Sequence, residues 1–481
     1  MLLKFPGEFV WGTAISAFQT EMGTSEKSIF RKTDWYEWAN SVEILGEGLV
    51  SGDKPQNGDG FWDLYEEDMK RAKSLGNNAI RMSIEWARIF NEPTFSCDAN
   101  FIRNEKGEPL SFSQSATSFE QLRSVANADA LDHYEKMIDF AHSIGLKVFM
   151  TLYHWPLPLW LHRPEKCHKN VENTNEKGWL DTRTIEEFAK YAFFISKTLG
   201  PMVDSWETIN EPEVIATNGY VFGSSSGFPP GLENVPMAFK VERNLAFAHN
   251  MAYKILKKNT GREIGIGSAP QFFEPKSSDP RDVEMAETAR YLNNEWILNA
   301  SVNGEFDNNL SGKPDEKIPG FGGTDYVGID YYSRMKVEYA EGEHYAGALP
   351  MKFLPCENCS DFQWDIFPQG IRAVTNWIYK KYGKPIYILE NGIADSKDEK
   401  RGNFIIDHLN ALSQTISLDK VPVKGYFHWS LIDNFEWADG FSMRFGLYEV
   451  NYETKERKMR NSAEIYEKIC KGLPVERGGT K

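Results

Sequence analysis

Strand-like and helix-like segments alternate along the whole chain, and this alternation limits the possible folds more than any other feature. We expect eight strands, over residues 9–17, 78–86, 146–153, 203–209, 263–269, 324–332, 385–389 and 423–429. We expect helices over residues 61–75, 130–144, 184–199, 236–257, 281–298, 370–381, 403–416 and 462–471. Strands joined by helices indicate an α/β fold with a parallel sheet, and eight such units predict a closed (β/α)8 barrel, the TIM barrel.

A doubly wound open sheet is the alternative fold. It would carry a glycine-rich phosphate turn after the first strand, and GTAISAFQTE at residues 12–21 is not G-x-G-x-x-G. Residues 91–127 and 335–367 are long insertions after the second and sixth strands, the first with room for a hairpin and the second irregular. Because no Gly/Ser/Pro-rich linker divides the chain, we expect residues 1–481 to form a single catalytic domain.

Charge and hydropathy exclude several classes of partner. The net charge is -15 and no block of five Lys or Arg occurs, which argues against nucleic acid and anionic membranes. The apolar run at residues 9–18 lacks the basic head of a signal peptide. No segment is long and apolar enough to span a membrane. We therefore expect a soluble cytoplasmic protein.

The five cysteines are too few and too scattered for a disulfide framework. Cys356 and Cys359 form a lone C-x-x-C pair, whereas a structural zinc site requires four ligands. We expect either a local disulfide or two loop thiols here, and no bound metal.

Polar side chains collect where the expected strands end, which in this barrel is the catalytic face. Strand four runs into Asn210 and Glu211, and strand seven into Glu390 and Asn391. Two carboxyl groups suit glycoside hydrolysis, in which one protonates the leaving oxygen and the other attacks the sugar or activates water. Amides, His and Trp at the other strand ends suit sugar hydroxyls and ring faces. This chemistry requires no cofactor.

Each of these residues also has a structural interpretation. Glu211 alone reads as a solvated loop acid, because Pro212 should end the strand there. Arg81 could form an interior ion pair, His154 and Tyr332 could be satisfied core residues, and Trp429 and Trp437 could be packing aromatics. Their joint placement at strand ends favours the catalytic interpretation.

Six motifs in order resemble glycoside hydrolase family 1, and in particular archaeal β-glycosidases. They read FVWGTAISAFQTE, RMSIEWARIF, LYHWPLP, TINEP, LENG and YFHWSLIDNFEWADGFSMRFGL. The resemblance runs from about Phe5 to the last helix. It implies a retaining β-glycosidase that acts on β-linked oligosaccharides or on aryl and alkyl glycosides.

The resemblance also implies roles for single residues. Glu211 matches the general acid/base and Glu390 the nucleophile, and retaining chemistry places such carboxyls about 5–5.5 Å apart. Arg81 and Tyr332 match neighbours of the nucleophile, and Trp364 an aromatic on the leaving-group side. Seven residues match groups around the non-reducing sugar: Gln19, His154, Trp155, Asn210, Trp429, Glu436 and Trp437. Phe445 lies in the loop after strand eight, together with Glu436 and Trp437.

Three positions depart from the family pattern. Leu389 stands where Thr is usual, Asp330 where Asn is usual, and Gln363 where Gly is usual. Asp330 would raise the pKa of Glu211 if it were ionised, but it could equally be protonated or ion-paired.

The sugar preference stays open between close relatives. HWPLP resembles glucose- and galactose-active enzymes, which we favour, while FGLYEVN followed by TKER resembles mannose-active ones. A β-mannosidase or β-fucosidase is the alternative. A 6-phospho-β-glycosidase is disfavoured because Glu436 would repel phosphate, and a thioglucosidase or a non-catalytic sugar-binding relative would have lost a glutamate. The archaeal resemblance also implies a homo-oligomer, a dimer or a tetramer.

Overall fold

The computed structural model describes residues 1–342, 345 and 349–478. Eight strands close a barrel in the order in which they occur along the chain, and neighbouring strands pair in parallel. They are β1 (Val10–Ala14), β2 (Ala79–Ser83), β5 (Lys147–Tyr153), β6 (Ser205–Ile209), β7 (Glu263–Ser268), β11 (Tyr326–Asp330), β14 (Ile386–Glu390) and β15 (Val423–Trp429). The (β/α)8 barrel is therefore confirmed, and the open-sheet alternative is wrong.

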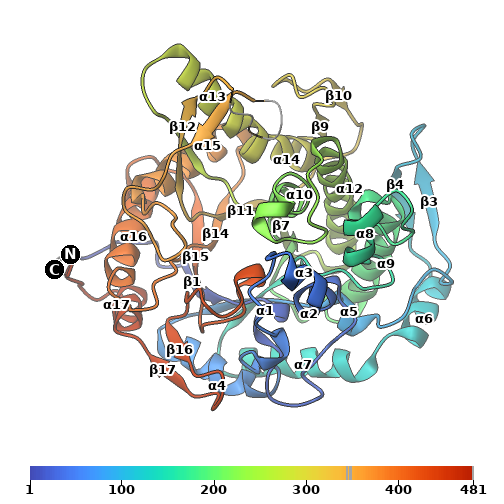
Figure 1. Ribbon diagram of the computed structural model, residues 1–481. Coiled ribbons are helices and arrows are strands. Elements are labelled where there is room, and N and C mark those ends of the chain that lie inside the picture. The colour runs from blue at the N-terminus through green and yellow to red at the C-terminus, as the bar shows by residue number, and fades with distance from the viewer. Residues whose placement is uncertain (343–344, 346–348, 479–481) are drawn as a thin grey trace.

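Long helices surround this barrel (Figure 1). They are α4 (Phe61–Ser74), α7 (Ala128–Ser143), α9 (Arg183–Lys197), α12 (Val235–Thr260), α13 (Pro280–Arg290), α15 (Pro368–Tyr382), α16 (Arg401–Ser417) and α17 (Asn461–Cys470). The helix expected at residues 281–298 changes character after α13, where two π-helical turns, Tyr291–Glu295 and Asn299–Asn303, flank α14 (Trp296–Leu298). Within the described residues, no helix has the length and apolar character needed to cross a membrane.

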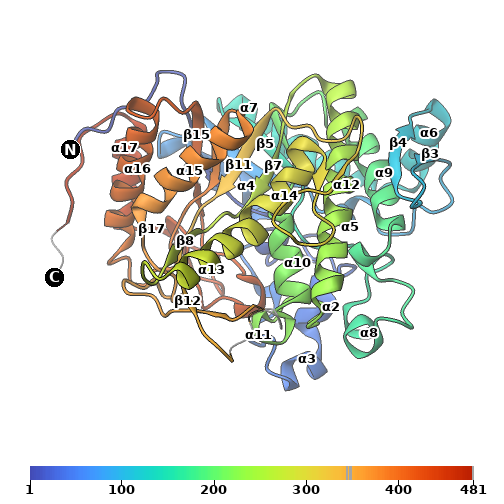
Figure 2. The ribbon, with the colours of Figure 1, turned by 90° about the horizontal axis from the view of Figure 1, so that it is seen from above.

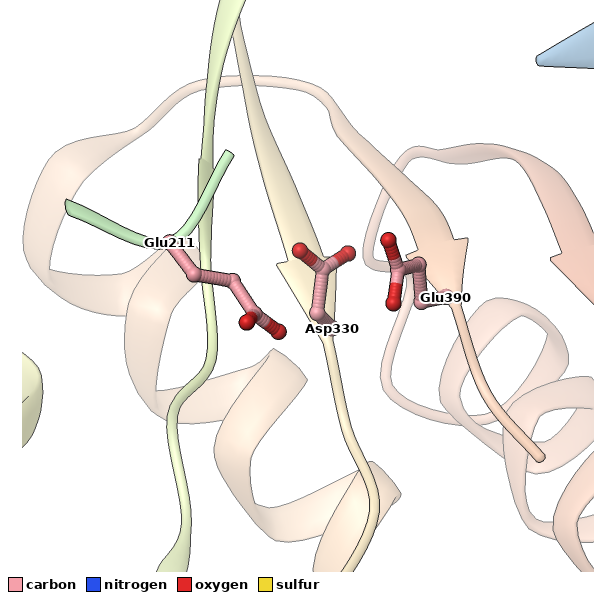
Figure 3. Close-up of side chains that lie close together, drawn as sticks. All are labelled: Glu211, Asp330 and Glu390. Carbon is pink, nitrogen blue, oxygen red and sulfur yellow. The ribbon is translucent and has the colours of Figure 1, made fainter. Parts of the chain in front are cut away.

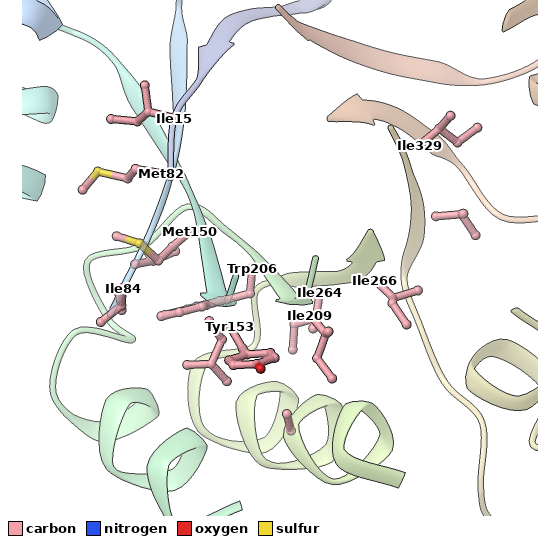
Figure 4. Close-up of a cluster of buried hydrophobic side chains, with 14 of the residues drawn as sticks. Ile15, Met82, Ile84, Met150, Tyr153, Trp206, Ile209, Ile264, Ile266 and Ile329 are labelled. Carbon is pink, nitrogen blue, oxygen red and sulfur yellow. The ribbon is translucent and has the colours of Figure 1, made fainter. Parts of the chain in front are cut away.

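The strands bury side chains on both faces, as parallel strands covered by helices do. Their outer faces pack beneath the helices, and Met82, Met150, Trp206 and Ile264 belong to this layer (Figure 4). Their inner faces fill the barrel with a second cluster that includes Phe149, Tyr326, Tyr387, Leu389 and Phe427. The interior is thus a packed core at one end, and only the carboxyl ends of the strands are free to form a site.

The first insertion contains the hairpin for which its length left room. Strands β3 (Asn100–Arg103) and β4 (Pro109–Ser113) pair antiparallel, and α6 (Ala116–Val125) follows them.

The second insertion is not irregular, so that prediction is wrong. Its strands β12 (Arg334–Tyr339) and β13 (Met351–Phe353) form a small sheet with β8 (Phe272–Pro275). The partner strand β8 lies far away in the sequence, and the periodicity of a single segment does not predict which distant strand it pairs with. Cys356 and Cys359 form a disulfide in the loop that follows, so the first of the two alternatives for this pair holds.

Short elements gather over the carboxyl ends of the barrel strands, at the lower side of Figure 2. They include α2 (Asp34–Asn40), α3 (Val42–Gly46), α8 (Pro164–Asn170), α10 (Pro212–Tyr220) and α11 (Gly223–Ser226). The remaining short elements are α1 (Ala17–Thr20), which follows β1 and carries Gln19, α5 (Trp86–Ile89), which follows β2, and β9 (Glu305–Phe306), β10 (Glu316–Lys317), β16 (Tyr448–Val450) and β17 (Arg457–Met459).

Pro212 corrects one expectation about this end of the barrel. It was expected to lead from strand four into a loop, but it is the first residue of α10. Proline suits that position because its missing N–H would have no helical partner there. Glu211 consequently occupies the N-cap position of α10, without a capping hydrogen bond from its side chain, and is not a loop acid.

Candidate active site

A cavity of about 850 Å³ opens at the carboxyl ends of the strands. Twelve of the predicted site residues line it: Gln19, His154, Trp155, Asn210, Glu211, Tyr332, Trp364, Glu390, Trp429, Glu436, Trp437 and Phe445. Arg81 lies behind this wall and donates hydrogen bonds to two of the lining residues, Glu390 and Asn210. The volume of the cavity falls within the range of about 300–1,000 Å³ that is usual for small-molecule sites.

Glu390 is the last residue of β14 and is held by two donors. Its Oε1 accepts a hydrogen bond from Arg81 Nη1 at 2.5 Å, and its Oε2 accepts one from the Tyr332 hydroxyl at 2.5 Å. Burial raises the pKa of Tyr332 well above its usual value, so this hydroxyl keeps its proton and donates. Charge-assisted bonds of this kind fix the orientation of a carboxylate.

Arg81, on β2, connects three groups of the site. Besides Glu390, its guanidinium donates from Nε to Glu207 at 2.8 Å and from Nη2 to the Asn210 side-chain oxygen at 2.5 Å. Sequence reasoning missed Glu207. The signal was its position in β6, where it faces the barrel interior while Trp206 packs outward and Thr208 bonds His249 of α12.

Glu211 has a different environment, although it lies close by. Its backbone is left-handed, with φ of 45°, and its N–H donates to the Gly267 carbonyl at 3.2 Å. Among the described residues, no donor to its carboxylate is found within hydrogen-bond distance. Burial, followed by repulsion from Glu390, raises the pKa of Glu211 well above its usual value. The neutral acid is therefore favoured.

Asp330, at the end of β11, lies between these two glutamates (Figure 3). One oxygen from each of the three carboxyls lies within 4.8 Å of the other two. Neither oxygen of Asp330 has a hydrogen-bond partner within the described part of the chain, and the residue is only 1% exposed. Burial, and then repulsion from Glu390, raises its pKa well above the usual value.

Hard cations such as Mg²⁺ and Ca²⁺ bind oxygen ligands, and these three carboxyls have suitable spacing. However, Arg81 and Tyr332 already bond both oxygens of Glu390. A metal ion bound here would therefore compete with these two donors for the oxygens of Glu390.

The opposite wall presents polar groups held in position by one another. Gln19 donates to Glu436 at 3.3 Å and to Asn434, which sequence reasoning missed, at 3.1 Å. Asn210 donates to His154 Nε2 at 3.3 Å. Burial lowers the pKa of His154 well below its usual value, so the ring stays neutral. These groups offer donors and acceptors to several hydroxyls.

Aromatic rings complete this wall. The His154 ring stacks on Trp429 and on Trp437 with centroids 6.1 Å apart in each case, and Trp155 donates from Nε1 to the Asn210 carbonyl at 3.1 Å. Such faces suit the apolar side of a sugar ring.

The outer part of the cavity is more apolar. Trp364 stacks on Phe362 with centroids 4.3 Å apart and approaches Phe445. Gln363, one of the departures from the family pattern, has a left-handed φ of 59°. Sequence reasoning missed the further wall residues Phe222, Phe228, Phe273, Met335 and Phe353.

Three site residues have a left-handed backbone: Trp155, Glu211 and Trp437, with φ of 82°, 45° and 50°. Such conformations cost about 1–3 kcal/mol each and persist where the surrounding structure enforces them. The residue types at these positions do not predict this conformation, because every L residue with a side chain disfavours the left-handed region.

Comparison with known proteins places the chain in a family. The model of Glycosyl hydrolase family 1 matches residues 1–100 and 120–473. The chain is 36% identical to a β-galactosidase of Saccharolobus solfataricus, covering 98% of this chain and 95% of the relative. It is 37% identical to a β-galactosidase of Pyrococcus woesei, covering 97% and 96%. The solved β-glycosidase of Thermosphaera aggregans superimposes with a TM-score of 0.91 at 34% identity, covering 98% of each chain. The chain is a member of glycosyl hydrolase family 1.

Proposed function

We propose that this family 1 glycosidase removes terminal β-D-glucosyl or β-D-galactosyl residues from the non-reducing ends of its substrates with retention of configuration. The observation that carries the proposal is the close approach of Glu211 and Glu390, whose nearest oxygens lie within 4.8 Å. Retaining enzymes hold such carboxyls about 5–5.5 Å apart, whereas inverting enzymes leave about 6.5–9.5 Å for a water.

In the first step, Glu390 attacks the anomeric carbon and Glu211 gives its proton to the leaving glycosidic oxygen. The bond from that oxygen to the anomeric carbon breaks, and the sugar becomes an ester of Glu390. The oriented carboxylate and the protonated acid suit these two roles.

In the second step, water replaces the ester. Loss of the charge on Glu390 lowers the repulsion felt by Glu211, which now ionises more readily and takes a proton from the attacking water. The water oxygen bonds the anomeric carbon from the face that the leaving group vacated, and Glu390 departs as a carboxylate. Two inversions give net retention.

The sugar itself is proposed from the wall around Gln19, His154 and Glu436 and from the relatives, which are named as β-galactosidases and β-glucosidases. We expect hydrolysis of nitrophenyl β-glucoside and β-galactoside to exceed that of the β-mannoside and β-fucoside. Proton NMR of the first-formed sugar should show the β-anomer. Initial release of the α-anomer would overturn the retaining mechanism, and a preference for the mannoside would replace the sugar assignment.

We also infer a homo-oligomer. One solved relative, 34% identical to this chain, is a β-glucosidase mutant derived from a tetrameric structure. Another, 35% identical, is the monomer structure of a β-glucosidase mutant that forms a dodecamer in the crystal. Light scattering on the purified full-length protein should give the mass of a dimer or tetramer. A monomer mass across a tenfold concentration range would contradict this.

A further inference from the structure

We propose that Asp330 is a positioning residue, which holds a second exchangeable proton beside Glu211 and so extends the activity of the enzyme to higher pH. The proposal rests on the proposed function of Glu211 as the acid.

The first argument is charge balance. Four buried carboxyls lie close to one another at the strand ends, from Glu207 on β6, Glu211 before α10, Asp330 on β11 and Glu390 on β14, and the carboxyls of Glu213 and Glu436 also line the cavity. Arg81 on β2 bonds two of these four, because its guanidinium pairs with Glu207 and Glu390. Among the described residues, no cation bonds Glu211 or Asp330, and two buried like charges so close together are strongly disfavoured.

The second argument is the placement of Asp330. Strand β7 lies between β6 and β11, and its Gly267 leaves room for acids from both neighbours. An ideal Cβ on Gly267 would lie 1.9 Å from Glu207 Oε1 and 3.4 Å from Asp330 Oδ2. Neither of these oxygens has a hydrogen-bond partner in the part of the chain that the structure describes. Asp330 thus has three acids around it, with Glu207 approached across Gly267 and with Glu211 and Glu390 within 4.8 Å.

The consequence follows from coupled titration. When two acids interact strongly, the last proton to leave belongs to the pair. While that proton remains, it can reside on Glu211, which is the form that protonates the leaving group. Removing Asp330 removes the repulsion, and Glu211 then loses its proton at a lower pH.

The test compares pH profiles of kcat/KM on an aryl β-glucoside. Asp330→Asn keeps the size of the side chain and removes its acid. We expect its alkaline limb to move down by about one pH unit, with activity on the acid side close to wild type. At pH values above both limbs this makes the variant about tenfold less active than wild type. Asp330→Ser, which removes the acid with less bulk, should move the limb in the same direction if the asparagine variant does not fold.

The matched control is Glu242→Gln on α12. Glu242 is 3% exposed, its Oε1 has no hydrogen-bond partner within the described residues, and burial raises its pKa. It lies outside the cavity, so its replacement should leave the limb in place. A folded Asp330 variant with a wild-type alkaline limb would overturn the inference. An inactive wild-type enzyme would instead overturn the proposed function.

Discussion

The two glutamates of the cavity carry the same carboxyl group but meet opposite surroundings. Glu390 ends a strand, lies in ordinary extended backbone and accepts hydrogen bonds from Arg81 and Tyr332. Glu211 is the N-cap residue of a helix, in left-handed backbone, and among the described residues no donor lies within hydrogen-bond distance of its carboxylate. Burial and repulsion raise the pKa of Glu211, so it tends to remain an acid.

We assign the proposed roles from the neighbours of each carboxyl, because the residue type is the same in both. A carboxylate held by a cation is suited to attack, whereas one deprived of cations is suited to donate a proton. Variants on the Glu390 side and variants on the Glu211 side should therefore change the kinetics in different ways.

The largest effect is expected from Glu390→Ala. Without the group proposed to form the covalent intermediate, turnover should fall by about 10⁴-fold or more on every substrate. Initial rates on activated and unactivated glycosides measure this, with the exposed Glu399→Ala as the control. Near-normal activity would remove Glu390 from the nucleophile role.

Glu211→Ala should have a smaller effect that depends on the substrate. General acid catalysis contributes about 10²–10⁴-fold, but an activated aryl leaving group needs little protonation. We expect heavy losses on alkyl glycosides and light losses on dinitrophenyl glycosides in the first step. In the wild type, activity should fall as pH rises through the elevated pKa of Glu211, and the variant should lose this limb. Equal losses on all leaving groups would contradict the acid role.

Tyr332→Phe should weaken the Glu390 side more gently. A hydrogen bond to a charged group contributes about 1.5–3 kcal/mol, so kcat should fall by about 10- to 100-fold. Tyr331→Phe is the matched control, because its hydroxyl donates to the Phe367 carbonyl at 2.8 Å and not to the cavity. Similar losses in both variants would indicate general damage to the strand end.

The smallest effect is expected from Glu213→Gln, near Glu211, and concerns the pH dependence of the stability of the fold. Glu213, two residues into α10, accepts bonds from Ser268 and from the Ala269 N–H, and burial raises its pKa to about 7. The folded state therefore binds a proton more tightly than the unfolded state. This contribution is complete below the ordinary pKa of Glu and is lost as pH rises through about 7. The Tm should fall over this range, and Glu213→Gln should flatten the slope. An unchanged slope would refute the assignment.

Much of this architecture was predictable because it depends on local patterns. The eight strands are short and apolar, and their order fixes which side chains reach one rim, so Glu211, Glu390 and Asn210 could be grouped together. The pairing of β12 with β8 could not be predicted, since it depends on contacts between distant segments. The hydrogen bond from Arg81 to Glu207 could not be predicted either. The sequence pattern of each strand is compatible with more than one alignment of the two strands, and therefore does not say which residues face each other. Left-handed backbone at Glu211 is likewise imposed by packing around it.

The pairing of β1 with β15, which sets Val10 beside Gly425, has a consequence for the growing chain. The first strand leaves the ribosome hundreds of residues before its second neighbour is made. Until then the sheet has two open edges, at β1 and at the most recent strand, and such edges invite association with other chains. Closing contacts so distant in sequence is slow. Because β14, which carries Glu390, is the strand next to the closing one, the cavity is completed only after β15 has been made. A chain truncated before residue 423 would keep both carboxyls but would have an unclosed barrel.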